Sequence, residues 1–306
     1  MSAPPDLSVV VLNYNTRHHL RRCLDSIRAE GSTSLSGAPA SLAAELWVVD
    51  NRSRDGSAEM VAREYPWANL VRSPRNGGFA HGNNQALRQV RGRAVLLLNP
   101  DTELEPGAFE ALLRLLKAHP EAGAIGPRLL RDDGTIHRAC RRAFPRPEVA
   151  LFQLSGLSQR FAASPLFGRY NLTNLPDDAP AEVDAICGAC MLVRREAMDQ
   201  VGLLDERFFM YAEDIDWCWR LKQAGWTVRY EPSIVVRHQH GAAGSGRRLA
   251  TTYHFYHAMD LFYRKHYARS YNLAVGTFVL VGVYCGLVFA LLRQVLDRDG
   301  KRRAGH

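Results

Sequence analysis

The sequence predicts an α/β domain built on a mostly parallel sheet with helices on both faces. Three observations support this fold class. The chain has 306 residues and is 46% hydrophobic, so it can bury a sizeable core. Short runs of β-branched and aliphatic residues alternate with amphipathic stretches at the spacing of βαβ units. Polar clusters follow the apolar runs, at the strand ends where ligands bind in open α/β sheets.

The elements can be assigned in chain order. We expect strands at residues 7–13, 45–51, 69–73 and 93–99, alternating with helices at 17–28, 57–65 and 84–90. Several prolines and little periodicity predict a long irregular crossing segment over residues 143–182. Regular structure is expected to resume at Val183 with a strand entering a helix. A helix closed by Gly225 and two strands over residues 226–238 follow.

The end of the chain differs in character from the rest. Residues 253–267 are aromatic with basic residues at the far end, which predicts an amphipathic helix in a bilayer interface. Residues 270–292 contain no charge and are long enough to span hydrocarbon, although a re-entrant or bundle-buried helix stays open. We therefore expect two regions: an α/β domain at 1–245 and a helical, basic, membrane-associating region at 246–306, with its apolar helix at about 270–292.

Charge is distributed unevenly along the chain. Of the net charge of +8, residues 246–306 contribute +7. This excess lies beside the apolar run and not along a folded face, which disfavours a nucleic-acid partner and suits anionic lipid headgroups. The first residues show no basic n-region and no apolar h-region, so we expect no signal peptide and a catalytic part in the cytoplasm. The CxxC of Cys187 and Cys190 lies in an apolar run and is interpreted as packing.

Polar side chains cluster at the ends of four predicted strands. Asn and Asp side chains can read a base and a ribose, and glycines permit close approach of a ligand to the backbone. The glycines of RNGGFAHGNN at 75–84 have the wrong spacing for a dinucleotide fingerprint, which disfavours an oxidoreductase. The other clusters are Asn13, Tyr14 and Asn15; Asp50, Asn51 and Ser53; and Asn99 and Asp101.

Asp101 lies in NPDT, directly after a predicted buried strand. A diphosphate leaving group needs its charge neutralised, and a hard cation held by Asp101 would do this, with Mg²⁺ or Mn²⁺ as the candidates. One carboxylate is a thin site, so a second ligand is expected. His238 is the candidate and His240 the fallback.

Three carboxylates, Glu213, Asp214 and Asp216, crowd the start of a predicted helix. Pairing with Arg220 at i,i+4 and the helix macrodipole account for Asp216. They account less well for Glu213 and Asp214, because flanking aromatic residues provide an apolar setting that can raise the pKa of a carboxylate toward that of a useful base. The aromatic residues are Phe208, Phe209, Tyr211, Trp217 and Trp219.

Six strings occur in a fixed order: NYN, DNRSRDGS, NGGFAHGNN, NPDT, GACMLVRREA and DERFFMYAEDIDWCWR. In this order they resemble the family 2 glycosyltransferases of GT-A fold, and particularly their bacterial rhamnosyltransferase-like branch, from about residue 7 to about residue 240. The chain departs from the family pattern at RHQHGAAGS, which offers two histidines and a stretched loop.

The resemblance implies roles for individual residues. Asp101 would contact the metal with His238, Asp214 would be the catalytic base, and Glu213 would orient the acceptor. Gly188, Ala189 and Trp217 would lie on the acceptor side. The residues expected around the nucleotide sugar are Asn13, Tyr14, Asn15, Asp50, Asn51, Ser53, Asp55, Asn76, Gly77, Gly78, Phe79, Asn83, Asn99 and Asp101.

The resulting expectation is an inverting glycosyltransferase at the cytoplasmic face of the cell membrane. It would move a sugar, first of all L-rhamnose from dTDP-rhamnose, to a hydroxyl of a glycan or lipid-linked acceptor in cell-envelope polysaccharide synthesis. Galactofuranosyl, glucosyl or N-acetylglucosaminyl transfer is the alternative, as is a catalytically silent nucleotide-sugar-binding module. A homo-oligomer stays open.

Overall fold

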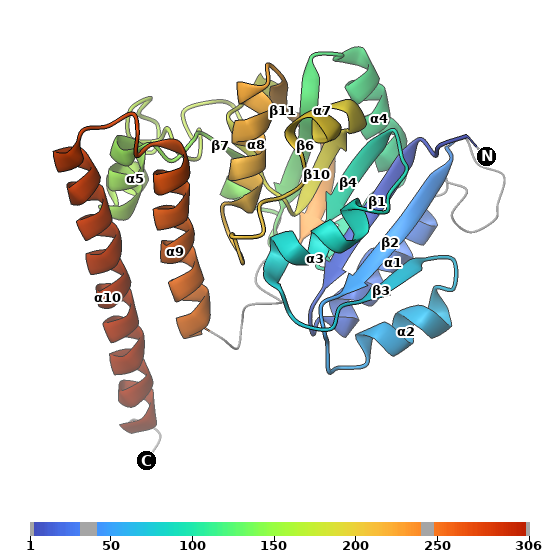
Figure 1. Cartoon of the computed structure of the whole chain (residues 1–306), viewed down its shortest axis with the longest axis horizontal. Helices are drawn as coiled ribbons and strands as arrows, with labels where there is room; N and C mark the ends of the chain where they lie inside the picture. Colours follow the sequence, from blue (N-terminus) through green and yellow to red (C-terminus); the bar gives the residue numbers. More distant parts are fainter. Residues whose placement is uncertain (1–2, 31–41, 240–247, 304–306) are drawn as a thin grey trace.

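The computed structural model describes residues 3–30, 42–239 and 248–303 (Figure 1). Its central sheet has the strand order β3-β2-β1-β4-β10-β6-β11-β5, and β8 also pairs with β11. A second sheet joins β7 to β9. The strands are β1 Leu7–Asn13, β2 Ala44–Asp50, β3 Asn69–Arg72, β4 Ala94–Leu98, β5 Thr102–Leu104, β6 Ala122–Leu130, β7 Arg141–Arg142, β8 Ala181–Glu182, β9 Ala185–Ile186, β10 Cys190–Arg194 and β11 Thr227–His238.

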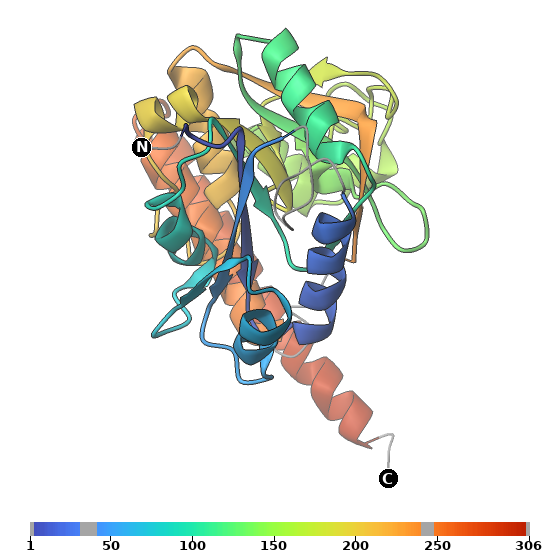
Figure 2. The same ribbon diagram turned by 90° about the vertical axis from the view of Figure 1, so that its right-hand side faces the viewer.

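Helices cover both faces of the central sheet. Figure 2 shows α3, α7 and α8 on one side of the strands and α1 and α4 on the other. The helices are α1 Arg17–Ala29, α2 Ser57–Glu64, α3 Gly78–Leu87, α4 Ala108–Ala118, α5 Pro147–Leu154, α6 Leu157–Arg160, α7 Arg195–Val201, α8 Glu213–Gln223, α9 Arg248–His266 and α10 Leu273–Arg303.

The strand directions confirm the predicted fold class. β1 pairs in parallel with both β2 and β4, and β3 pairs in parallel with β2. β10 runs antiparallel between β4 and β6, and β11 is again parallel to β6. Because β1 to β4 are parallel, their carboxyl ends lie at one edge of the sheet, and the polar clusters of the sequence meet there.

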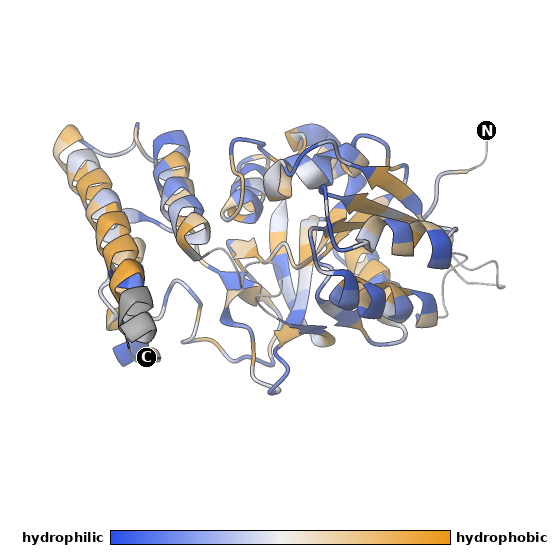
Figure 3. Cartoon of the chain, turned by 90° about the horizontal axis from the view of Figure 1, so that it is seen from below, coloured by the Kyte–Doolittle hydropathy of each residue, from blue (hydrophilic) through white to orange (hydrophobic). Residues whose placement is uncertain are grey.

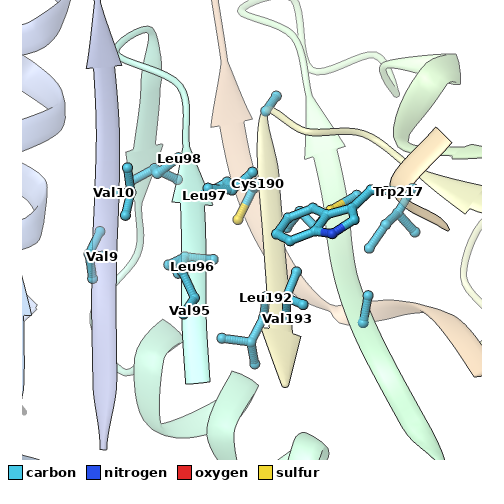
Figure 4. Close-up of a cluster of buried hydrophobic side chains, with 14 of the residues drawn as sticks. Val9, Val10, Val95, Leu96, Leu97, Leu98, Cys190, Leu192, Val193 and Trp217 are labelled. Atoms are coloured by element: carbon cyan, nitrogen blue, oxygen red, sulfur yellow. The ribbon is translucent and has the colours of Figure 1, made fainter. Parts of the chain in front are cut away.

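Strands β1, β4 and β10 form the centre of the core. They read as continuous apolar runs because both of their faces are covered. Figure 4 shows Val9, Leu96 and Leu192 on neighbouring strands, with Trp217 of α8 packed beside β10. Trp217 is fully buried, and its indole N–H donates to Gly202 O at 2.9 Å.

Three elements differ from their predicted form. Helix α3 begins at Gly78, six residues before the expected start, because its glycines allow close packing: a methyl group on Gly82 would lie 2.4 Å from Leu12 Cδ1. Residues 227–238 form the single strand β11, whose register shifts between Glu231 and Val235, where two strands were expected. The crossing segment contains the two short helices α5 and α6.

Helix α9 lies between α8 and the outermost helix α10 (Figure 1). Its Ala258 and Phe262 are buried, and Trp219 of α8 meets the Phe262 ring edge-on. On its other side, Asp260 accepts a hydrogen bond from Tyr284 of α10 at 3.0 Å. Helix α9, which was predicted to lie in a bilayer interface, is therefore packed between two other helices along much of its length.

Helix α10 contains the one candidate membrane span within the described part of the chain, Leu273–Leu296. This stretch has 24 residues and a mean hydropathy of 2.4, and only 6% of its most apolar window is buried. Figure 3 shows that hydrophobic residues cover most of its length. The apolar run predicted at 270–292 is therefore helical from Leu273 onward, with one face against α9 and many of its other side chains exposed.

Asp216 of α8 joins this helix to α9. Its side chain is fully buried and pairs with Lys265 Nζ at 2.5 Å, His266 Nε2 at 2.7 Å and Arg220 Nε at 2.9 Å. Burial raises the pKa of Asp216, but hydrogen bonds from His266 and Lys265 lower it by more, so the net pKa lies below its ordinary value. Two of the three basic partners, Lys265 and His266, come from α9, a connection that the predicted Arg220 pair did not include.

We predict that Asp216→Asn destabilises the protein strongly. The substitution keeps the shape of the side chain and leaves Lys265 and His266 without their shared anion. Removing one partner of a buried pair costs about 3 kcal/mol or more, which lowers Tm by roughly 6 °C or more.

Thermal unfolding of the full chain measures this loss. Asp199→Asn is the matched control, because the Asp199 pair with Arg195 also spans i,i+4 on a helix but is exposed. Its loss should cost less than about 1 kcal/mol. Equal changes in Tm for the two variants would contradict the role of Asp216.

Candidate active site

Asn13, Asp50 and Ser53 form one hydrogen-bonded network at the carboxyl ends of β1 and β2. Asn13 Nδ2 donates to Asp50 Oδ1 and to Ser53 Oγ, both at 3.0 Å. Ser53 N donates to the second oxygen of Asp50 at 2.9 Å. Asn13 and Asp50 are buried, so the network fixes the turn after β2 and sets the floor of the edge where a nucleotide was expected.

Asp55 holds the starts of two helices together. One of its oxygens accepts from Arg17 N, at the beginning of α1, at 2.8 Å, and the other accepts from Ser57 N and Oγ at the beginning of α2. Burial raises the pKa of Asp55, but these hydrogen bonds lower it by more, and the net pKa is below its ordinary value. Asp55 thus accepts hydrogen bonds from the first residues of both helices and holds the strand-end loop between them.

Asn51 and Asn76 cap the start of α3. Asn51 Nδ2 donates to Asn76 Oδ1 at 2.9 Å and to Gly78 O at 3.1 Å. In return, Gly77 N donates to Asn51 Oδ1 at 3.2 Å and Gly78 N to Asn76 Oδ1 at 3.1 Å. The two amides therefore occupy donors that a helix leaves unsatisfied at its N-terminus, and they fix the backbone of residues 76–78.

Residues 76–79, which lie on the predicted donor side, contact the segment that precedes α8. Phe79 N donates to Phe209 O at 2.6 Å. Gly78 has φ +85°, and a methyl group there would lie 2.1 Å from Phe209 O, so both the conformation and the space require glycine. A methyl group on Gly188 would lie 3.3 Å from Phe79 Cζ and 3.4 Å from Asp214 Cβ. Gly188 thus borders both a predicted donor residue and the predicted base.

Asp101 and His238 face each other across a short gap. Both are buried, and Asp101 Oδ1 lies 3.2 Å from His238 Nε2. Within the described residues, Asp101 Oδ1 accepts no hydrogen bond. An octahedral ion with bonds of about 2.1 Å places neighbouring ligands about 3.0 Å apart, so the pair fits a shared Mg²⁺ or Mn²⁺. No third His, Cys, Asp or Glu of residues 3–30, 42–239 and 248–303 completes a cluster. His240 lies outside the described residues.

Asp214 accepts three hydrogen bonds. Arg142 Nη2 and Gly188 N donate to its Oδ2 at 2.7 and 2.9 Å, and Ile215 N donates to its Oδ1 at 2.7 Å. Both Arg142 and Asp214 are buried. Burial lowers the pKa of the Arg142 guanidinium, but the adjacent Asp214 carboxylate raises it by more, so Arg142 remains charged. The pair places one compensated negative charge at the start of α8.

Glu213 lies beside this pair in a different environment. It is buried, and its Oε2 has no hydrogen-bond partner among the described residues. Burial, and then the charge of Asp214, raise the pKa of Glu213 to about 8. The Glu213 carboxyl is therefore protonated at neutral pH and can donate a hydrogen bond. A carboxyl whose pKa is raised beside a second carboxylate is typical of acid and base assignments in active sites.

The backbone before α8 is strained. Tyr211 and Ala212 have φ of 72° and 62°, in the left-handed region that side chains with a Cβ rarely adopt. Such residues cost of order 1–3 kcal/mol each and cluster at functional sites. This turn lets the chain enter α8 with Glu213 and Asp214 both directed inward.

Of the remaining predicted residues, most lie near the candidate site and one, Trp217, lies in the core. Tyr14 and Asn83 lie within the strand-end loop and α3, and Asn99 Nδ2 lies 3.5 Å from His238 Nε2. Ala189 is buried and its carbonyl accepts from Asn99 N at 2.9 Å. Trp217 needs correction: its place in the core leaves it no surface for an acceptor, because α8 turns that side chain toward β10.

Two residues beside the site were missed. Arg142 is the direct partner of Asp214, and the His137 ring meets the His238 ring edge-on with centroids 5.1 Å apart. Both lie between β6 and β9, just before the irregular segment predicted at residues 143–182. A basic residue without a nearby acid in the sequence was the available signal for Arg142, but such a signal does not name the distant partner.

Comparison with known proteins identifies the family. The model of glycosyl transferase family 2 matches residues 8–202. The chain belongs to this family. It is 32% identical over 258 residues to an N-acetylglucosaminyl-diphospho-decaprenol L-rhamnosyltransferase of Mycobacterium tuberculosis, covering 80% of this chain and 79% of that protein. A rhamnosyltransferase of Escherichia coli K12 is 29% identical over 172 residues, covering 53% of this chain and 60% of that protein.

Solved structures support the GT-A-like fold of this family 2 glycosyltransferase. A mannosyltransferase of Pyrobaculum calidifontis, solved with GDP-Man and Mn²⁺, has a TM-score of 0.55 and 19% sequence identity. The match covers 100% of this chain and 82% of the mannosyltransferase chain. At this identity the likeness concerns the fold alone.

We predict that Glu213→Gln removes an alkaline loss of activity. In the native enzyme, kcat for sugar transfer should fall as pH rises through about 8, because Glu213 loses its proton and places a second negative charge beside Asp214. Glutamine keeps a donor and cannot ionise. The variant should therefore retain kcat at pH 7 within roughly tenfold, less than the loss of a general base, and show no fall near pH 8.

The pH dependence of kcat between pH 6 and 9.5 measures this effect. Glu182→Gln is the control, because Glu182 is exposed and pairs with Lys222 away from Asp214. It should keep the native profile. A Glu213→Gln variant that is inactive at pH 7, or that keeps the fall near pH 8, would contradict the neutral role of Glu213.

Proposed function

We propose that this family 2 glycosyltransferase is an inverting enzyme that moves a sugar from a nucleotide diphosphate donor to a hydroxyl of a glycan or lipid-linked acceptor. One observation carries the proposal: Phe79, on the predicted donor side, and Asp214, the predicted base, both border Gly188. A donor bound at the strand ends would therefore present its reactive carbon next to a buried carboxylate.

The reaction needs one base and one leaving group. The acceptor oxygen attacks the anomeric carbon of the donor sugar, and the bond from that carbon to the diphosphate oxygen breaks, with its electron pair leaving on the diphosphate. The hydroxyl proton passes to Asp214. Because attack and departure occur on opposite faces of the sugar, the configuration inverts. Protonated Glu213 would donate a hydrogen bond to the acceptor and orient it.

Asp101 and His238 are the residues that would hold a divalent cation, Mg²⁺ or Mn²⁺. When bound, such an ion neutralises charge on the departing diphosphate. Two protein ligands suffice where phosphate oxygens and water complete the coordination, as Mg²⁺ sites commonly do. The 3.2 Å separation of Asp101 Oδ1 and His238 Nε2 supports this assignment.

L-Rhamnose from dTDP-rhamnose is the donor we propose first. The support is the resemblance to two rhamnosyltransferases, one of which is named for an N-acetylglucosaminyl-diphospho-decaprenol acceptor. Galactofuranosyl, glucosyl and N-acetylglucosaminyl donors are the alternatives. A lipid-linked acceptor also agrees with helix α10, which would hold the active site at the cytoplasmic face of a membrane.

We predict that two variants separate donor binding from transfer. Asp214→Asn should lower kcat by about 10²- to 10⁴-fold, because the general base is lost. It should bind the donor normally. Asp101→Ala should instead lose the strengthening of donor binding by Mn²⁺ or Mg²⁺, because one of two cation ligands is gone.

Calorimetric titration with dTDP-rhamnose, UDP-sugars and GDP-sugars, with and without each metal, measures binding, and release of nucleotide diphosphate measures turnover. Asp133→Asn is the control, because Asp133 is exposed in a turn. A near-native rate for Asp214→Asn would refute the base assignment. Donor binding without transfer in the native protein would favour the silent binding module.

We predict that charge on the outer face of α10 releases the protein from membranes. Phe278 and Phe289 are 68% and 70% exposed. Each Asp near the centre of a spanning helix costs about 2.5–3.5 kcal/mol, so Phe278→Asp with Phe289→Asp should abolish flotation with anionic liposomes.

The control replaces both residues with Leu, which keeps an apolar face of similar size. It should float like the native protein. If the double Asp variant also floats and resists high salt, α10 is not what binds the membrane.

A further inference from the structure

Two consecutive arginines, Arg141 and Arg142, form strand β7 and are almost completely buried. A buried guanidinium needs partners that compensate its charge. Successive side chains of a strand point to opposite faces, so the two residues reach different parts of the protein. Their partners therefore separate a structural role from a role in the active site.

Arg141 anchors the crossing segment. Its guanidinium donates to Pro176 O at 2.5 Å, to Leu175 O at 2.9 Å and to Asp177 Oδ1 at 2.6 Å. It also lies over the Tyr230 ring, 5.0 Å from the centroid. None of these partners belongs to the predicted active site, so Arg141 serves packing.

Arg142 faces the active site. Its Nη2 donates to Asp214 Oδ2 at 2.7 Å and to Ile186 O at 2.9 Å. The contact with the carbonyl of β9 fixes where the guanidinium lies, and the contact with Asp214 transmits that position to the start of α8. Arg142 is thus held by the second sheet and acts on a residue of another element.

The two oxygens of Asp214 are used unequally. A carboxylate offers about four lone-pair sites, two on each oxygen. Arg142 and Gly188 N fill both sites on Oδ2, whereas Ile215 N fills one on Oδ1. Among the described residues, one site is left without a donor, and it is on Oδ1.

We propose that Arg142 is a positioning residue that fixes Oδ2 of Asp214, so that Oδ1 is the atom that receives the proton of the acceptor hydroxyl. This inference rests on the proposed glycosyl transfer. Arg142 itself contacts neither donor nor acceptor in this scheme.

In this scheme the hydrogen bond between Arg142 and Asp214 persists through the reaction. When Oδ1 takes the proton, Oδ2 becomes the carbonyl oxygen of a carboxylic acid and still accepts from Arg142 and Gly188 N. No buried donor loses its partner at that moment. Neutral Glu213 leaves Asp214 as the anion that the Arg142 charge balances in this pocket, which agrees with the raised pKa of Glu213.

Replacement of Arg142 by Gln and by Lys tests the proposal. Arg142→Gln should lower kcat by roughly 100-fold at pH 7 with the KM for the donor unchanged. Arg142→Lys keeps the charge and a donor but not the planar fork, so it should recover part of the lost kcat, again with the KM for the donor unchanged.

Arg141→Gln is the matched control, since it removes an equally buried guanidinium from a different carboxylate. It should lower Tm and leave kcat close to native. An Arg142→Gln variant with native kcat overturns the proposal, as does one whose loss of activity lies in the KM for the donor. If that variant does not fold, Arg142→Lys decides, and a fully native kcat in this variant, which lacks the planar fork, overturns the proposal.

The experiment separates this inference from the proposed function. A native enzyme that transfers sugar while Arg142→Gln behaves normally refutes the role of Arg142 alone. A native enzyme that transfers no sugar from any donor of the screen refutes the proposed function, and the positioning role with it.

Discussion

Three carboxylates enter the protein interior in the first turn of α8, and each one is accommodated differently. Glu213 is held neutral by burial and by its charged neighbour. Asp214 is balanced by Arg142, and Asp216 by a cluster of Lys265, His266 and Arg220. Since an uncompensated buried charge costs several kcal/mol, the position of α8 depends on all three solutions. The elements that supply the partners, β7 and α9, are tied to the active site for this reason.

Residues 76–79, on the predicted donor side, contact the segment just before α8 through backbone atoms. Gly78 and Phe79 approach Phe209, and Phe79 and Asp214 both border Gly188. These contacts fix the position of the strand-end loops relative to α8. A small displacement of one would therefore move the other. Such coupling suits a reaction in which the reacting atoms must approach within about 3–3.5 Å.

The fold was largely predictable because each parallel strand is an apolar run followed by polar residues. The sequence alone therefore identified Asn13, Asp50 and Asp101 at or just after the ends of β1, β2 and β4. The start of α3 was missed because NGGFAHGNN reads as a loop until Asn51 and Asn76 cap it from other segments. Trp217 was predicted on the acceptor side but lies in the core. The sequence pattern around an aromatic residue near an acid is the same whether its side chain faces a ligand or the core. Arg142 could not be found from its neighbours, because its partner lies 72 residues further along the chain.

The expected boundary at residue 245 meets a physical difficulty in the Asp216 cluster. A chain ending there would keep Asp216 and Arg220 but lack Lys265 and His266, so a fully buried anion would retain one of its three basic partners. Water would have to enter beside α8 to solvate it. The C-terminal helices therefore supply two of the three basic partners of this carboxylate, and a chain shortened at residue 245 would be a chemically altered protein.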